Sequence, residues 1–204
     1  TDSPTVTPES PTTEIVSTIV PAETVDVNAG SSGVGDSLYP DFGNSGYDAA
    51  HYTLDFTVNN VATSDLTAIV TIEAKAIQNL SSFNLDFIGF EIDEITVNGE
   101  TAEFSRKGQE LTIHPLKPLA ENESFTVAVK YNGSPEEMQS VALPVQTGWV
   151  TVDGGSFVLS EPDGSASYYP VNDHPLDKAS YTFRVTVPEP FEVAANGVLT
   201  ETTD

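Results

Sequence analysis

Apolar and polar residues alternate with a period of two along most of the chain from about residue 47. In residues 51–58 every second side chain is apolar: Tyr52, Leu54, Phe56 and Val58. Because successive side chains of a strand point to opposite faces of a sheet, this pattern predicts half-buried β-strands. Similar patterns predict further strands at residues 66–76, 82–87, 91–97, 110–114, 124–131 and 181–187.

Turn-forming residues separate these strands. The polar run 59–65 lies between the first two, so we expect them to pair as a hairpin. Asn98-Gly99 is the dipeptide most typical of a tight hairpin turn. The apolar positions of 91–97 do not keep one register, which predicts a bulge. Since no window shows a helical stripe, the predicted fold class is all-β, an antiparallel β-sandwich or saddle-shaped sheet.

Residues 1–46 have a different composition, rich in Thr, Ser, Pro, Glu and Gly. Residues 1–49 hold eight acidic residues and no Lys or Arg. Such a sequence buries too little apolar area to offset the entropy of ordering. We therefore predict a low-complexity extended tail or linker over 1–46 and a β-domain over 47–204. Within the tail, residues 14–27 are rich in β-branched side chains and predict an extended strand, which Pro21 limits to a sheet edge.

Composition narrows the classes of function. The 204 residues include 7 Lys and Arg against 31 Asp and Glu, a net charge of −24 that repels nucleic-acid phosphates. No apolar run reaches the roughly 18 residues of a membrane helix, so we expect no membrane insertion. There is no cysteine, and the three histidines, His51, His114 and His174, are too dispersed to suggest a metal site. An acidic Ser/Thr/Pro-rich stalk suits an extracytoplasmic protein, secreted or anchored to the cell envelope through the tail.

Common catalytic motifs are missing from the sequence: it has no HExxH, no phosphate-binding glycine loop and no G-x-S-x-G. One segment stands out, residues 157–178, FVLSEPDGSASYYPVNDHPLDK. It resembles neither a strand nor a low-complexity loop, and Asn172 and Asp173 can cap local backbone groups. From the residues alone, a well-packed corner of the sheet is an equally good interpretation.

Five stretches in order carry a resemblance to a known family. They are YDAAHYTLDFTV at 47–58, the hairpin succession at 80–115, YNGSPE at 131–136, SEPDGSASYYPVNDHPLDK with the strand after it at 160–188, and FEVAANGVL at 191–199. Together they resemble the N-terminal domain of bacterial gluzincin zinc aminopeptidases, of the aminopeptidase N and leukotriene-hydrolase type. The resemblance implies a saddle of β-strands lying over a thermolysin-like catalytic domain of the same polypeptide. Zinc and its HExxH motif would belong to that domain, so residues 47–204 would be a C-terminally incomplete, non-catalytic fragment with no cofactor of its own.

The resemblance also implies a substrate-binding role. In the family, a Gln or Glu in the block before the prolines binds the free α-amino group of a peptide substrate. The matching positions are Glu161 and Asp163, and which of the two acts is left open. A carboxylate there would form a strong charge-assisted bond with an ammonium and explain a requirement for peptide N-termini.

The block also departs from the family pattern. Glu161 stands where relatives often have Gln, and Tyr168-Tyr169 replaces Trp-Phe. Val171 replaces Cys, and Ser167 stands near the position of an Arg. The missing Arg removes an ion pair that could have oriented the acid.

A second hypothesis belongs to a different class of function. The chain could be a non-catalytic extracellular β-module for adhesion or strand-exchange assembly. The edge of an incomplete sheet would then accept residues 14–27 of another copy. Self-association that depends on concentration and disappears when residues 1–40 are removed would favour this hypothesis.

Overall fold

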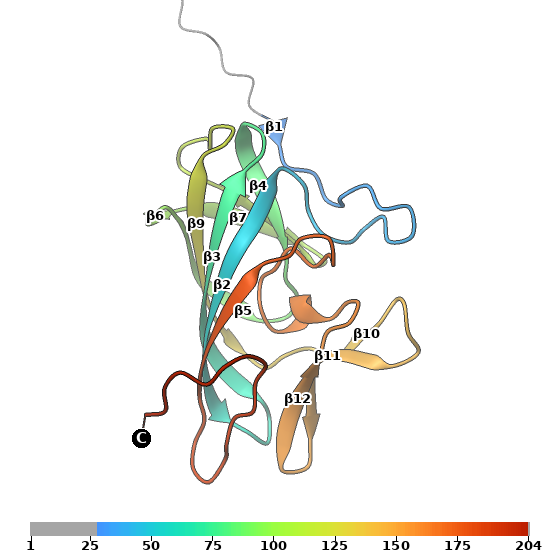
Figure 1. Ribbon diagram of the computed structural model, residues 1–204, viewed down its shortest axis with the longest axis vertical. Helices are drawn as coiled ribbons and strands as arrows, with labels where there is room; N and C mark the ends of the chain where they lie inside the picture. The colour runs from blue at the N-terminus through green and yellow to red at the C-terminus, as the bar shows by residue number, and fades with distance from the viewer. Residues whose placement is uncertain (1–27, 204) are drawn as a thin grey trace, which may run out of the picture.

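The computed structural model describes residues 28–203. In this range it contains thirteen β-strands and one turn of 3-10 helix, η1 (Ser165–Ser167) (Figure 1). The predicted all-β class is therefore confirmed. No helix within the described range has the length and apolar character needed to cross a membrane.

The largest sheet has six strands in the order β13-β2-β3-β9-β5-β6. The predicted hairpin between the first two strands is present, as are the turn at Asn98-Gly99 and a bulge between Ile92 and Glu94. Its strands are β2 (Tyr47–Asn60), β3 (Asp65–Ala76), β5 (Glu91–Val97), β6 (Glu100–Thr101), β9 (Ser124–Gly133) and β13 (Ser180–Thr186).

One expectation about this sheet was wrong. β13 pairs with β2 in parallel, so the sheet is mixed rather than wholly antiparallel. The chain reaches β13 from a separate small sheet and the segment that follows it, not through a hairpin turn. β13 also lies at the sheet edge, which leaves Tyr181 and Phe183 each 41% exposed although the alternation predicted a buried face.

A second sheet of four strands packs against the first. Its order is β1-β4-β8-β7, and β1 runs parallel to β4. Its strands are β1 (Asn28–Ala29), β4 (Leu80–Asp86), β7 (Glu103–Lys107) and β8 (Glu110–His114). The core lies between the two sheets, where the rings of Tyr47 and Phe125 from one sheet contact that of Phe83 from the other. Each large apolar side chain buried there contributes about 1.5–3 kcal/mol.

A third, small sheet projects from this body (Figure 1) and was not predicted. It is formed by β10 (Met138–Gln139), β11 (Gln146–Val152) and β12 (Gly155–Leu159). The turn at Asp153-Gly154-Gly155 joins β11 to β12 as a hairpin. The small sheet is tied to the β2–β3 turn by the buried Ser64, whose hydroxyl lies 2.7 Å from that of Thr151.

Residues 30–46, which we call the strap, contact both large sheets. Gly30 N–H donates to the carbonyl of Ser82, and Ile77 N–H donates to the carbonyl of Gly46. Within the strap, Phe42 and Asn44 are buried. The division of the chain at residue 46 stays a prediction, and the predicted strand at 14–27 lies outside the described residues.

Candidate functional site

The distinctive segment 157–178 begins in β12 and then folds back onto the core. Phe157 to Leu159 belong to β12, so the first residues of the segment do form a strand. After Pro162 the chain turns inward through η1, and residues 163–172 are buried. The segment is therefore held in place by packing on the core as well as by hydrogen bonds.

The two predicted binding residues lie in very different environments. Glu161 is exposed, two residues after the end of β12, and no hydrogen bond or ion pair of its carboxylate is found among residues 28–203. Asp163 is 1% exposed and accepts hydrogen bonds from the Ser140 hydroxyl (2.6 Å) and the Val141 N–H (3.0 Å). Asp163 thus anchors the loop between β10 and β11, and its carboxylate is already used inside the fold.

Asp173 also holds the turn after Glu161. From the sequence we expected this residue only to cap local backbone groups. Its carboxylate accepts the N–H groups of Gly164 and Ala166, both at 3.3 Å. Burial raises the pKa of Asp173 to about 6, although these same backbone hydrogen bonds act to lower it. The structure therefore confirms a capping role and places it at the turn that carries the candidate site.

A buried polar cluster beneath this turn was not predicted. Asp86 in β4 is fully buried and accepts hydrogen bonds from Asn44, Gln109 and the N–H of Asp173. The Asn172 side-chain amide donates to Asp177 and also pairs with the strap. These residues come from four separate parts of the chain, so no local spacing in the sequence could have predicted the cluster.

One departure from the family pattern, Ser167, is explained by burial. Ser167 is fully buried, donates to the carbonyl of Gly164 (2.9 Å) and accepts the N–H of Trp149 (3.2 Å). Gly148, at φ 82°, passes so close to Ser167 that a Cβ at position 148 would clash with its side chain. A long arginine side chain therefore has no room at position 167 in this packing.

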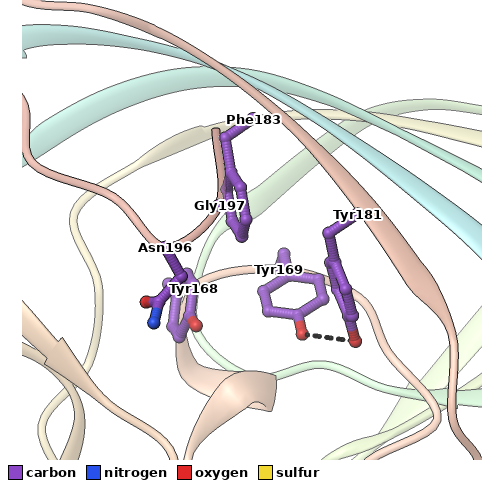
Figure 2. A pocket seen from close by; sticks show the side chains of 6 residues that line it. All are labelled: Tyr168, Tyr169, Tyr181, Phe183, Asn196 and Gly197. Carbon is purple, nitrogen blue, oxygen red and sulfur yellow. Dashed lines mark hydrogen bonds between the residues drawn. The ribbon is translucent and has the colours of Figure 1, made fainter. Parts of the chain in front are cut away.

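The adjacent tyrosines form one wall of a cavity of about 360 Å³. Figure 2 shows the rings of Tyr169 and Tyr181 with their hydroxyl groups facing each other, 3.4 Å apart. Burial raises the pKa of Tyr168, Tyr169 and Tyr181, so these hydroxyls stay neutral. With Phe183 as a further wall, the cavity is mainly aromatic and offers no charged group.

Two of the three histidines, His51 and His174, make hydrogen bonds within the fold. The Nδ1 atom of His174 accepts the N–H of Leu176, which places the proton on Nε2, 3.3 Å from the Asp36 carboxylate. His51 contacts the hydroxyls of Ser180 and Thr182. Among residues 28–203, no group of three or more His, Cys, Asp or Glu side chains could hold a metal ion.

Comparison with known proteins identifies the family. Residues 48–204 match the model of the Peptidase M1 N-terminal domain. The chain belongs to this family. The resemblance drawn from the sequence is therefore confirmed, and the segment around Glu161 is part of an M1 N-terminal domain.

Solved structures agree with this assignment. The chain is similar to the M1 zinc metallopeptidase of Deinococcus radiodurans, with 36% identity and a TM-score of 0.78 over 85% of this chain and 40% of that one. A two-domain M1 zinc metallopeptidase mutant bound to L-arginine gives 35% identity, a TM-score of 0.79 and the same coverage. Yeast LTA4 hydrolase, at 23% identity and a TM-score of 0.61 over 78% of this chain and 25% of that one, shares the fold. Among curated proteins, none matches the chain.

The chain spans about two fifths of the length of these M1 zinc metallopeptidases. Those relatives are zinc metallopeptidases, so zinc is implied for the full enzyme. The described residues do not fit a zinc ion, and we derive no step through one.

Proposed function

We propose that this domain belongs to a zinc metallopeptidase that removes N-terminal residues from peptides, and that Glu161 binds the α-amino group of the substrate. The observation that carries the proposal is the contrast between the two candidate carboxylates. Glu161 is exposed with no partner in the described part of the chain, whereas Asp163 is buried and accepts two hydrogen bonds. A ligand could reach the first without breaking any contact of the fold.

The chemistry of such a site is a charge-assisted hydrogen bond. A carboxylate held near the reacting bond pairs with the ammonium of a free N-terminus, and this pair strengthens when water is excluded. The related M1 zinc metallopeptidase mutants have been solved with L-arginine, L-tryptophan and the substrate Tyr-Ser-Ala bound. Free amino acids carry an α-ammonium group, which supports a carboxylate as the recognising partner.

In this proposal the domain itself is not catalytic, and its partner is the catalytic domain of the same polypeptide. That domain would supply zinc, the activated water and the general base. The small sheet, whose strand β12 leads into the segment with Glu161, and its loops expose apolar side chains, as an interface would require. These side chains are Val141, Leu143, Val145, Val152, Phe157, Val158 and Leu159. Strand exchange through residues 14–27 and a location outside the cytoplasm stay predictions.

The test is steady-state kinetics of the enzyme that carries this domain together with its catalytic domain. We expect Glu161→Ala to reduce kcat/KM for unblocked aminoacyl substrates by roughly 30-fold or more, mainly through KM, because removing one partner of a desolvated charge pair costs about 2–5 kcal/mol. Glu161→Gln keeps a hydrogen-bond acceptor and should lose less.

The matched control is Glu103→Gln, an exposed acid on β7 of the four-stranded sheet. Its kinetics should equal those of the wild type. An unchanged KM in Glu161→Ala would refute the role of Glu161. A rise in KM for unblocked substrates that occurs in Asp163→Asn but not in Glu161→Ala would transfer the role to Asp163.

A further inference from the structure

Asn44 makes the main hydrogen bonds between the strap and the candidate segment. The backbone N–H of Asn44 donates to Oδ1 of Asn172 (2.6 Å), and its carbonyl accepts from Nδ2 of the same side chain (3.1 Å). The Asn44 side chain donates to the Asp86 carboxylate (3.0 Å). All three residues are buried, so these hydrogen bonds are shielded from competing water.

The contacts continue from Asn44 to the turn that follows Glu161. The Asp86 oxygen that accepts from Asn44 also accepts the N–H of Asp173 (2.9 Å). Asp173 in turn accepts the N–H groups of Gly164 and Ala166 (3.3 Å each). Gly164 is three residues after Glu161, so an unbroken set of buried and partly buried hydrogen bonds joins the strap to this turn.

Two further contacts hold the strap against the segment. Gly43 has φ 65°, and a Cβ there would lie 2.6 Å from Cβ of His174, so the two backbones are in close contact. Asp36 lies 3.3 Å from the His174 ring nitrogen. The strap lies before the family match, which begins at residue 48, and these contacts pack it against the matched residues.

We propose that Asn44 is a positioning residue, through which the strap fixes the turn that carries Glu161. The Asn44 amide holds the Asp86 carboxylate, Asp86 holds the backbone of Asp173, and the Asp173 carboxylate holds the turn at Gly164 and Ala166. Asp163 fixes the same turn on its outer side through Ser140 and Val141. Only the consequence for substrate binding rests on the proposed function of Glu161.

Amide hydrogen exchange on the 204-residue chain tests the positioning without substrate or zinc. We expect Asn44→Ala to speed exchange of the Gly164 and Ala166 N–H groups about tenfold, because local opening releases their acceptor. Exchange in the central strands β3 and β9 should not change. Asn59→Ala is the matched control, since this exposed side chain donates only to the Thr67 hydroxyl.

If Asn44→Ala does not fold, Asp36→Ala provides the same test, since it removes the more exposed contact between the strap and His174. Faster exchange at Gly164 and Ala166 alone supports the proposal. Unchanged exchange at these two groups overturns it, and so does a uniform increase that includes β3 and β9.

The consequence for catalysis is measured separately in the two-domain enzyme. Asn44→Ala should raise KM for unblocked substrates several-fold while kcat changes less. An unchanged KM in Glu161→Ala would refute the proposed function, whereas the exchange result would still decide whether Asn44 positions the turn.

Discussion

At the scale of single residues, Asp86 has the most unusual environment in the described part of the chain. Its side chain is fully buried and accepts hydrogen bonds only from neutral groups: Asn44, Gln109 and a backbone N–H. Burial raises the pKa of Asp86 from 3.8 to about 7, although the hydrogen bond from the Asp173 N–H acts in the opposite direction. Desolvation outweighs these contacts because no cation compensates the charge.

This shift makes folding stability depend on pH. Between about pH 4 and pH 7, native Asp86 holds a proton that the unfolded chain has released. Stability should therefore be highest toward the acid end of this window, fall as pH rises to about 7, and change little above it. Asp173 and Asp177, whose pKa values burial raises to about 6, add to the same trend.

The measurement is the melting temperature from pH 5 to pH 8, compared between wild type and Asp86→Asn. We expect the wild type to lose several degrees more than the variant across this range. The Asn44 amide can rotate to accept from the introduced amide group, since its Oδ1 is buried without a partner in the structure. Equal slopes for the two proteins would show that Asp86 is not the titrating group.

At the scale of elements, Ser64 attaches the β11–β12 hairpin to the main body. Its hydroxyl lies 2.7 Å from that of Thr151 and 2.8 Å from that of Ser156, and it accepts the indole N–H of Trp149 (2.9 Å). We expect Ser64→Ala to destabilise the protein by about 1–3 kcal/mol, because it removes hydrogen bonds that contribute about 0.5–1.5 kcal/mol each and leaves the indole N–H of the half-buried Trp149 without its partner.

Trp149 is the only tryptophan of the chain, so its fluorescence reports on this attachment directly. In Ser64→Ala its emission should shift to the red as the indole gains contact with water. Ser105→Ala, at an exposed position of β7, should change neither the emission nor the melting temperature. An unchanged emission maximum in Ser64→Ala would show that the hairpin does not depend on Ser64.

The elements that the sequence predicted are those whose burial follows a regular period. β3 and β9 alternate regularly, as does β2 after its bulge between Ala49 and His51, and each buries one face in the core. β11 and β12 were not predicted because their burial does not alternate in this way. They are held instead by groups distant in the sequence, such as Ser64. The contacts of the strap were not predicted either, because they are hydrogen bonds of polar residues, which leave no apolar pattern in the sequence.

The candidate site was predictable only in part, and for a related reason. The resemblance to the family pointed to residues 161 and 163, but the residues alone could not show which carboxylate is exposed. The partners of Asp163 lie more than twenty residues earlier, in a loop without a sequence signature. Only the fold shows that Asp163 is used internally and Glu161 is not.

At the scale of the whole molecule, the dominant feature is unbalanced negative charge. Even if all 7 basic residues formed ion pairs, 24 of the 31 acidic residues would have no cationic partner. The one Arg–carboxylate pair in the described range, Arg184 with Asp55, is exposed and spans 4.0 Å. Exposed pairs of this kind contribute little, so repulsion among the acidic side chains opposes folding.

This repulsion should make the protein more stable in salt. The screening length falls from about 30 Å at 0.01 M to about 10 Å at 0.1 M salt, so we expect the melting temperature to rise by a few degrees in this range and then level off. Converting the exposed Glu91 and Glu103 to lysine adds two positive charges and removes two negative ones. That variant should melt higher than the wild type at low salt and respond less to added NaCl. A melting temperature that is flat or falls between 0.01 and 0.1 M NaCl would show that long-range repulsion is not a significant term in the stability of this domain.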